Sequence, residues 1–490
     1  MTTNSTASTG LPDAPTRLLL GGSWRDARDG RVFPVLDPAT GSVLAEVADA
    51  GPAEGAVALA LADDAQAAWA ATPPRVRSEV LRRAFELLLE RTEQFATVIT
   101  LEMGKPLAEA RGEVSYAAEF LRWFSEEAVR IDGRYTVAPD GASRFLVTRR
   151  PVGPSLLISP WNFPLAMAAR KVAPALAAGC TAILKPAEAT PLTALLFGEV
   201  LLEAGLPDGV LSVLPTSTPG ALVEPMLGDG RLRKLSFTGS TPVGRMLLAQ
   251  ASTRVLRTSM ELGGNAPFLV FDDADLDAAV DGAMLAKARN AGQVCTSANR
   301  LYVHEAIVAD FVRALAERMS ALPIGHGLDE GTRLGPLIDE RARQKVESLV
   351  RDAVERGASI VTGGERLEGA GTFYPPTVLT NVPRDARILA EEVFGPVAPV
   401  VPFASEAEAI ALANDTEFGL IAYAFTRDLD RGLRLAEALE VGMLGLNAGV
   451  IANPAAPFGG VKESGLGREG GAEGIDEYLE TTYVGIGRPR

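Results

Sequence analysis

Short apolar segments alternate with helical stretches through the middle of the chain, and this alternation constrains the fold more than any other feature. The segments SLLIS, TAILK, GVLSVLP, RKLSFTG and LRTSMELGG lie between residues 155 and 264, separated by stretches rich in Ala and Leu. Strands and helices that alternate in this way form a parallel sheet with helices on both faces. The sequence therefore predicts an α/β fold built on a doubly wound sheet.

The stretch before this alternation has a helical pattern. Residues 54–132 repeat apolar side chains every three or four positions, which is typical of helices with one buried face. The pair Gly104 and Lys105 lacks the upstream glycine of a phosphate-binding loop, so we interpret it as a helix end. In RSEVLRRAFELLLERTEQFATVITLE the expected buried face consists of Val80, Leu81, Phe85, Leu88 and Leu89.

Composition argues against several classes of function. A chain of 490 residues, 47% of them hydrophobic, is long enough for two or three domains. A formal net charge of -15 repels polyanions, so we expect neither nucleic acid nor an anionic membrane as a partner. Two cysteines and two histidines provide neither a disulfide framework nor metal-ligand spacing. We therefore expect a reduced, cytoplasmic protein without a structural metal.

Targeting segments are not expected either. The N-terminal MTTNSTASTGLPDAPT has no basic region and no apolar region, so it does not look like a secretory signal. We interpret residues 1–11 as a disordered tail. The longest nearly uncharged runs, such as residues 172–184, are shorter than the ~20 residues that a membrane-spanning helix needs.

Polar or glycine-rich residues follow the expected strands, at the edge where doubly wound sheets bind their ligands. In FTGSTPVG, Gly239 and Ser240 lie where a helix would begin and offer backbone N–H groups to a phosphate. Thr241 occupies the second glycine position of a GxGxxG motif, so this match alone is weak. Lys185 and Glu188 of KPAE follow the next strand. An acid there binds the ribose hydroxyls of a dinucleotide and repels a 2′-phosphate.

The two cysteines differ in their surroundings. Cys180, in APALAAGCTAILKP, has Ala, Ile and Leu as neighbours, which is typical of a packing residue. Cys295, in ARNAGQVCTSANR, lies instead among Gln293, Thr296 and Ser297. This polar setting suits a nucleophile and an ordinary loop residue about equally well.

Seven motifs in a fixed order carry a resemblance over almost the whole chain. They are PWNFP, KPAEATP, FTGSTPVG, ELGGNAPF, GQVCTSANR, EEVFGPV and PFGGVKESGLGREG. Together they resemble the NAD(P)-dependent aldehyde dehydrogenase superfamily. Within it the chain looks most like the succinate-semialdehyde dehydrogenase branch, through WNFPLAMAARKVAPALAAGC, DDADLDAAVDGA, NDTEFGL and SGLGREGGAEGIDEYLE.

The resemblance implies a covalent mechanism centred on one thiol. Cys295 would attack the aldehyde carbon and form a thiohemiacetal, whose oxyanion would be held by the Asn162 side-chain amide and the Cys295 backbone N–H. Loss of a hydride would leave a thioester, and Glu261 would activate the water that hydrolyses it. Many relatives of the succinate-semialdehyde branch carry a second cysteine where this chain has Ser297, so a disulfide switch at that position is not expected.

The resemblance also implies NAD(P) as the cofactor. Glu188 favours NAD, with NADP as the alternative. Glu392 would hold the nicotinamide ribose, with Glu391 as the alternative for that role, and Phe394 would lie against the ring. The cofactor residues implied by the motifs are Trp161, Asn162, Lys185, Pro186, Ala187, Glu188, Gly239, Ser240, Leu262, Glu392 and Phe394.

The substrate is implied by two arginines. Arg170 and Arg289 match the residues that bind the distal carboxylate of succinate semialdehyde in that branch, but Ala452 replaces a serine there. A relaxed-specificity enzyme, acting on glutarate semialdehyde or an aliphatic aldehyde, is therefore the nearest alternative. More remote alternatives are a thiol hydrolase that needs no nucleotide and a non-catalytic binding or structural protein.

The resemblance implies an aldehyde dehydrogenase-like architecture: two doubly wound Rossmann-like domains and a small β oligomerisation arm. The dinucleotide-binding domain would contain residues 12–135 and 155–262, and the catalytic domain residues 263–446. Residues 136–154 and 447–490 would bridge the domains and form the arm, in which ASRFLVTRRPVG and IDEYLETTYVGIG read as strands. Such strands leave edges that need a partner, so we expect a homodimer or homotetramer.

Overall fold

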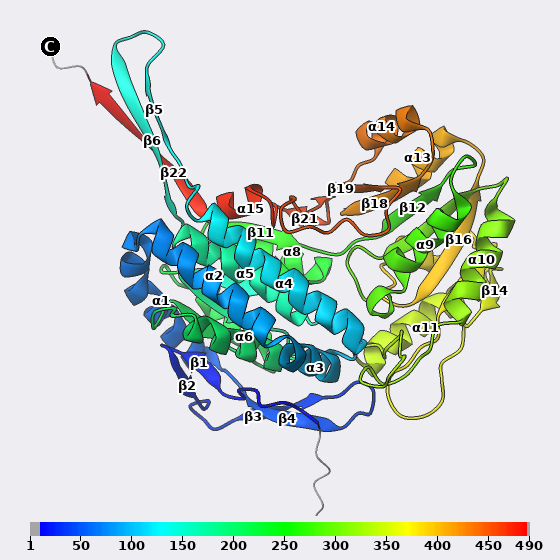
Figure 1. Cartoon of the computed structure of the whole chain (residues 1–490), viewed down its shortest axis with the longest axis horizontal. Coiled ribbons are helices and arrows are strands. Elements are labelled where there is room, and N and C mark those ends of the chain that lie inside the picture. Colours follow the sequence, from blue (N-terminus) through cyan, green and yellow to red (C-terminus); the bar gives the residue numbers. More distant parts are fainter. Residues whose placement is uncertain (1–9, 488–490) are drawn as a thin grey trace, which may run out of the picture.

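Two large sheets, each covered by helices, lie side by side in the computed structural model, which describes residues 10–487 (Figure 1). The first sheet has eight strands in the order β2-β1-β9-β8-β7-β10-β11-β21. Its strands are β1 (Leu18–Leu20), β2 (Ser23–Arg25), β7 (Ser155–Ile158), β8 (Ala182–Lys185), β9 (Leu211–Val213), β10 (Lys234–Thr238), β11 (Arg257–Glu261) and β21 (Gly465–Leu466).

The five central strands of the first sheet are parallel, and the chain winds outward from β7 in both directions. The predicted doubly wound sheet is therefore confirmed. The sequence did not predict the antiparallel strands β1, β2 and β21 at its two edges. The helices that connect the central strands are α5 (Pro164–Ala178), α6 (Pro191–Glu203), α7 (Pro219–Gly228) and α8 (Thr241–Ser252).

A layer of N-terminal helices covers α5, and every residue of α5 is buried. The layer contains α1 (Pro52–Ala71), α2 (Pro74–Glu90), α3 (Thr92–Met103) and α4 (Leu107–Glu127). In α2 the buried side chains include Leu87 and Leu88, whereas Leu89 is 40% exposed. The expectation for Leu89 was wrong because one residue turns a helix by about 100°, which carries Leu89 past the edge of the apolar face. Gly104 ends α3 in a left-handed conformation, which confirms the predicted helix end.

The second sheet has seven strands in the order β14-β15-β16-β13-β12-β18-β19, all parallel except β14. Its strands are β12 (Ala266–Val270), β13 (Ala298–His304), β14 (Ser359–Thr362), β15 (Thr377–Thr380), β16 (Val397–Phe403), β18 (Ile421–Phe425) and β19 (Met443–Leu446). Its helices include α9 (Leu276–Lys287), α10 (Val308–Ser320), α11 (Glu340–Glu355), α13 (Glu406–Asn414) and α14 (Leu429–Ala438).

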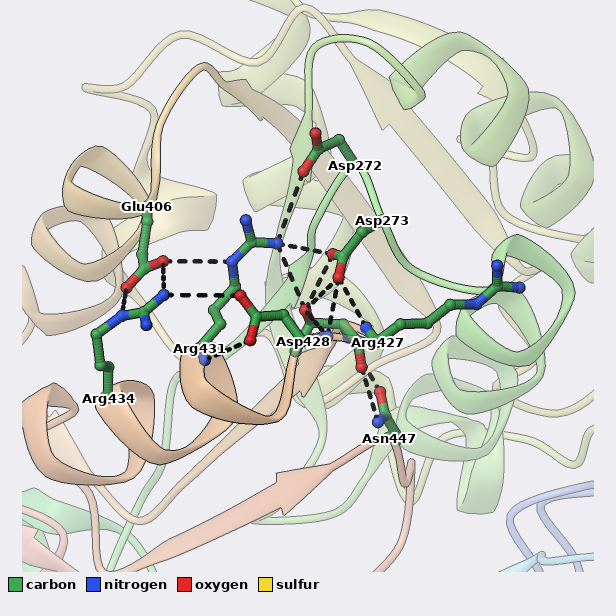
Figure 2. Close-up of polar contacts among 9 residues, drawn as sticks. Asp272, Asp273, Glu406, Arg427, Asp428, Arg431, Arg434 and Asn447 are labelled. Carbon is green, nitrogen blue, oxygen red and sulfur yellow. Dashed lines mark hydrogen bonds and ion pairs between the residues drawn. The ribbon is translucent and has the colours of Figure 1, made fainter.

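An ionic network joins α13 and α14 to the turn that follows β12 (Figure 2). Asp273 accepts hydrogen bonds from the backbone N–H groups of Arg427 and Asp428 and from the Arg431 guanidinium. Asp428 caps α14, and Glu406 binds Arg431. Several charges shared in one network hold a helix more firmly than isolated surface pairs do. The network therefore fixes the edge of the second sheet.

A three-stranded antiparallel sheet projects from the molecule (Figure 1). It consists of β5 (Arg134–Val137), β6 (Ser143–Pro151) and β22 (Leu479–Gly487), with β6 in the middle. The two segments expected to be strands are thus paired with each other over the whole length of β22. We call this sheet the arm.

Four further expectations concern the domain boundaries, the N-terminal tail, membrane-spanning helices and metal sites. The domain boundaries stay a prediction, and the tail expected at residues 1–11 lies almost wholly outside the described residues. Within residues 10–487 no helix is both long and apolar enough to cross a bilayer. In the same part of the chain, no three His, Cys, Asp or Glu side chains come together as a metal site requires.

Candidate active site

A cleft of about 1160 Å³ separates the two sheets. It lies at the carboxyl ends of β7, β8, β10 and β11 and at the amino ends of β13 and β16. Most of the site residues expected from the sequence line it, namely Trp161, Asn162, Arg170, Glu188, Gly239, Ser240, Leu262, Arg289, Cys295, Glu392 and Phe394. The others, Glu261, Lys185, Pro186 and Ala187, do not line the cleft.

Cys295 lies on a turn just before β13. The preceding residues Asn290, Ala291 and Gly292 all have φ between 52° and 73°, and a side chain on Gly292 would collide with the Gly395 carbonyl. Three consecutive left-handed residues are costly, and strain of this kind is typical of functional loops. Cys295 is partly buried and lines the cleft, and desolvation of its thiol raises the pKa of Cys295 to about 12 despite the Arg170 charge. It is therefore protonated at neutral pH.

Cys180, by contrast, is fully buried, and its Sγ donates to the Tyr478 carbonyl at 3.4 Å. It lies in the apolar core with no access to the cleft, as a packing residue should. Only one of the two thiols can therefore meet a small molecule in the cleft.

Asn162 is held at the Cys295 loop by a set of hydrogen bonds. Its Nδ2 donates to the Gln293 carbonyl at 3.0 Å. Its backbone carbonyl accepts from Lys105 Nζ at 2.8 Å and from Asn290 Nδ2 at 3.0 Å. These bonds fix both the main chain and the amide of Asn162 next to the thiol loop.

A buried ion pair that the sequence did not reveal supports Asn162 from behind. Lys105 Nζ lies 2.5 Å from Glu113 Oε2, and both side chains are 0% exposed. The other oxygen of Glu113 accepts the backbone N–H groups of Leu165 and Ala166 at the start of α5. From the sequence, Gly104 and Lys105 indicated only the end of a helix. Lys105 stands between a glycine and a proline, outside any periodic pattern that would predict its burial.

Glu261 ends β11 and is 3% exposed. Its Oε2 has no hydrogen-bond partner among residues 10–487. Burial, together with the nearby Glu469 carboxylate, raises the pKa of Glu261 well above its usual range. Glu469 itself is bound by Arg170 and Lys171. Glu469 and Lys171 stand in two of the quoted motifs, but no role was assigned to them, because nothing in either motif indicates that the two side chains meet.

The residues expected to bind a dinucleotide lie along one end of the cleft. Ser240 precedes α8, whose first turn therefore offers free backbone N–H groups next to Gly239. The Glu392 carboxylate accepts the Gly264 N–H at 3.2 Å, and burial raises the pKa of Glu392 to about 7. Phe394 contacts the Trp161 ring edge to face, with centroids 5.4 Å apart.

Lys185 and Glu188 lie at the carboxyl end of β8. Lys185 is buried, and its Nζ lies 3.5 Å from Glu188 Oε2. The Glu188 side chain is 58% exposed and lines the cleft. Ser217, which also lines the cleft, donates to Asp49 at 2.6 Å. Polar groups suited to ribose hydroxyls therefore cluster here.

Two guanidinium groups lie near the thiol at the other end of the cleft. Arg170 is 1% exposed, contacts the Phe458 ring and forms an ion pair with Glu469. Arg289 lies over the Phe163 ring, with its Cζ 5.6 Å from the ring centroid. Arg170 Nη2 and Arg289 Nε are buried without hydrogen-bond partners among the described residues.

Tyr116 of α4 also lines the cleft, and burial raises its pKa although the charges of Arg170 and Arg289 oppose the shift. Tyr116 was not predictable as a site residue, because it fits the helical pattern of residues 54–132. Ala452 lines the cleft as expected and brings no hydroxyl there.

A thiol on a strained turn, facing a cleft at the ligand edge of a doubly wound sheet, is the arrangement of an enzyme that binds a dinucleotide and reacts through a cysteine. The sequence profile of the aldehyde dehydrogenase family matches residues 24–484. The chain therefore belongs to the aldehyde dehydrogenase family. It is an NAD(P)-dependent enzyme that oxidises aldehydes, which excludes the hydrolase and the non-catalytic alternatives.

Individual relatives are similar over nearly their whole length. A succinate-semialdehyde dehydrogenase of Paenarthrobacter nicotinovorans is 60% identical, covering 91% of this chain and 99% of that protein. A glutarate-semialdehyde dehydrogenase of Pseudomonas putida is 50% identical, covering 95% and 97%. Among solved structures, an NADP-dependent enzyme of Escherichia coli superposes with a TM-score of 0.96 at 49% identity, covering 97% and 98%. The fold expected from the sequence is confirmed.

Proposed function

We propose that the protein oxidises an aldehyde with a distal carboxylate, with succinate semialdehyde, converted to succinate, as the first candidate. One observation carries this proposal. Arg170 Nη2 and Arg289 Nε are buried donors without acceptors among the described residues, and both side chains line the cleft that holds Cys295. Buried donors are nearly always satisfied, so an anionic group of the substrate is the acceptor that fits.

Residues on both sides of the cleft would share the chemistry. Cys295 attacks the aldehyde carbon and forms a thiohemiacetal, whose oxyanion accepts hydrogen bonds from the Asn162 amide and the Cys295 backbone N–H. Each donor of this kind is worth about 3 kcal/mol in other enzymes. NAD(P), when bound, supplies the hydride acceptor. Glu261 takes a proton from the water that hydrolyses the thioester on Cys295, and this releases the carboxylic acid.

The preference for a carboxylated substrate depends on how much of the positive charge of Arg170 and Arg289 is not already compensated by acidic side chains of the protein. Glu469 already compensates part of the Arg170 charge, so Arg289 contributes most of the attraction for a carboxylate. The Tyr116 hydroxyl lies on the same wall of the cleft and can donate where Ala452 lacks a hydroxyl. This arrangement supports a carboxylated aldehyde even without the serine of the succinate-semialdehyde branch.

Glutarate semialdehyde is the alternative substrate, because it carries the same carboxylate on a chain one methylene longer. Glutarate-semialdehyde dehydrogenases are as similar to this chain as several succinate-semialdehyde relatives. One methylene is worth only about 1–3 kcal/mol in discrimination. The ratio of kcat/KM for the two aldehydes decides between them.

For the cofactor we propose NAD in preference to NADP, because the Glu188 carboxylate lines the cleft next to the expected ribose site. A negative carboxylate there repels a 2′-phosphate. Glu188→Ser should therefore raise kcat/KM with NADP while changing it less with NAD. Equal efficiency of the unaltered protein with both cofactors would contradict this proposal.

Steady-state kinetics on matched aldehydes tests the proposed substrate. Arg289→Ala should cost about 2–4 kcal/mol in kcat/KM on succinate semialdehyde, because it removes one partner of a buried charge pair. Butanal, which lacks the carboxylate, should lose far less. An equal loss on both aldehydes would mean that Arg289 only supports the Cys295 loop.

A second experiment tests the assignment of the thiol. Cys295→Ala should abolish NADH formation while NAD still binds, as measured by calorimetry. Cys180→Ala, the matched control, should keep its kcat. Retained activity in the Cys295 variant would refute the covalent mechanism.

A further inference from the structure

One buried amine beside the Cys295 turn has no part in the mechanism described so far. Lys287 is the last residue of α9, and its side chain is fully buried. It forms no salt bridge with any residue in the range 10–487. A lysine is rarely buried without a carboxylate partner, because its charge loses its hydration. Such a position calls for a reason other than stability.

The hydrogen bonds of Lys287 lead to the segment that carries the thiol. Its Nζ lies 2.9 Å from Asn299 Oδ1 and 3.3 Å from Ser297 Oγ. Ser297 follows Cys295 by two residues in the turn, and Asn299 is the second residue of β13. The amine thus ties the end of α9 to the turn and to the strand behind it. Tyr423 holds the same turn from the other side, through a 2.8 Å bond to the Thr296 carbonyl.

Lys287 also interacts electrostatically with Glu392, which lines the cleft. Burial lowers the pKa of Lys287 to about 7, and the charge of Glu392 opposes this shift. Lys287 in turn lowers the pKa of Glu392, against the larger effect of burial. Within the described part of the chain, Glu392 is the charged group that acts on Lys287, whereas Glu392 also feels the charge of Lys345 and the Gly264 N–H, both more strongly than Lys287. The two groups therefore influence each other's charge near neutral pH.

We propose that Lys287 is a positioning residue of the oxidation reaction, whose amine fixes the Cys295 turn through Ser297 and Asn299. The proposal rests on the function proposed above. It assigns no contact between Lys287 and the substrate. A positioning role accounts for a lysine at residue 287, where a methionine would fill the same volume without the cost of burying an amine.

The variant Lys287→Met tests this proposal, because methionine keeps the unbranched stem and removes the amine. The melting temperature should stay within a few degrees or rise, since replacing a buried charge with an apolar side chain of similar volume is often neutral or stabilising. The kcat should fall by about tenfold or more, because small displacements of reacting groups are expensive. A kcat within twofold of the unaltered enzyme would overturn the positioning role.

The pH profile separates the electrostatic part. In the unaltered enzyme KM for NAD should fall as the pH rises through about 7, as Glu392 becomes charged. In Lys287→Met this inflection should move to slightly higher pH, because one of the two lysine charges that favour the carboxylate is removed while Lys345, whose effect is larger, remains. An unmoved inflection would overturn the link to Glu392.

Two further variants complete the test: Ser297→Ala removes one of the hydrogen bonds of Lys287, and Lys234→Met is the control. Ser297→Ala should lower kcat by about fivefold, the loss of one hydrogen bond, with the NAD profile unmoved. Lys234→Met removes a second fully buried lysine, which bonds Ser259 at 2.5 Å at the far end of β10. It should leave both kcat and the pH profile unchanged. Failure of the proposed function would look different from failure of the Lys287 proposal. In that case the unaltered enzyme itself would release no NADH from any carboxylated aldehyde.

Discussion

At the scale of single residues, the charge state of the thiol decides when the enzyme can react. Burial keeps the Cys295 thiol protonated at neutral pH, although two guanidinium groups lie nearby. Only the thiolate is nucleophilic. The thiol therefore needs a proton acceptor, or a change in its surroundings, before it attacks an aldehyde.

Alkylation of the enzyme without NAD measures this charge state directly. The rate of reaction of Cys295 with iodoacetamide should rise about tenfold for each pH unit between pH 7 and 10, because the thiolate fraction grows in that way below the pKa. Mass spectrometry of the labelled peptide gives the rate, and buried Cys180 serves as the internal control. A plateau near pH 8.5, as for an exposed cysteine, would show that the thiol is not shielded.

The base beside the thiol should act only late in the reaction. Glu261→Gln should keep a rapid burst of about one NADH per site and then stall, because the water attack on the thioester lacks its proton acceptor. Stopped-flow absorbance at the NADH band measures the burst. The absence of a burst would mean that Glu261 acts before hydride loss.

The pH dependence of this step has a definite sign. The pKa of Glu261 is raised, so its carboxyl is protonated over a wider range of pH than usual and becomes a base only above that raised pKa. The rate of deacylation should therefore rise with pH through the Glu261 pKa in the unaltered enzyme. It should be flat in the Glu261→Gln variant.

At this scale the residues of the sequence motifs were predictable, but the contacts that hold their side chains in place were not. Cys295, Asn162 and Glu392 stand in recognisable local patterns, and the structure brings them into one cleft. Glu469 binds Arg170 and Lys171 across nearly three hundred residues of chain. Contacts of that length depend on tertiary packing, which no local pattern encodes.

At the scale of elements, buried carboxyl groups hold the starts of two central helices, α5 and α6. Glu113 of α4 accepts the first N–H groups of α5, and Glu102 of α3 accepts those of α6 at 2.8 and 2.9 Å. Side-chain oxygens at a helix N-terminus accept the N–H groups that have no partner within the helix, and they do so here although burial raises the pKa of Glu102 to about 8. The N-terminal helices therefore set the position of the helices beneath them.

Glu113→Gln tests this arrangement. It leaves the Lys105 ammonium buried without its partner, and the free energy of unfolding should fall by about 3–5 kcal/mol. The double variant Lys105→Met with Glu113→Gln should recover much of that loss. It should still show a reduced kcat, because the Asn162 carbonyl loses the Lys105 bond. Urea unfolding and steady-state kinetics on the same samples measure the two effects separately.

The parallel core of the first sheet was predictable because short apolar segments alternate with helical stretches. The edge strands β1, β2 and β21 were not, since each has only two or three residues, and β1 and β21 join the sheet through partners far away in the sequence. Leu89 shows a similar limit within a helix. A run of three leucines places one of them outside any single apolar face.

At the scale of the whole molecule, the arm presents apolar side chains to solvent. Tyr135, Tyr483, Val484 and Ile486 are between 42% and 65% exposed. Exposed apolar residues on an extended sheet are typical of a protein interface. We therefore keep the prediction of a homodimer or homotetramer.

The double variant Val484→Lys with Ile486→Lys tests that prediction. It should reduce the molar mass in solution, measured by light scattering after size exclusion, because buried charges disfavour association. Val255→Lys, at a position 91% exposed and outside the arm, is the matched control. A monomeric unaltered protein would refute the prediction at once.

The last part of the chain completes structures that earlier parts begin. Glu469 compensates the charges of α5, β21 extends the first sheet, and β22 closes the arm against β6. These contacts join residues nearly three hundred positions apart, and contacts of such long sequence separation form slowly in folding. Until Glu469 docks, the cations of Arg170 and Lys171 lack their counter-ion, so we expect the assembly of this wall of the cleft to be a late step in folding.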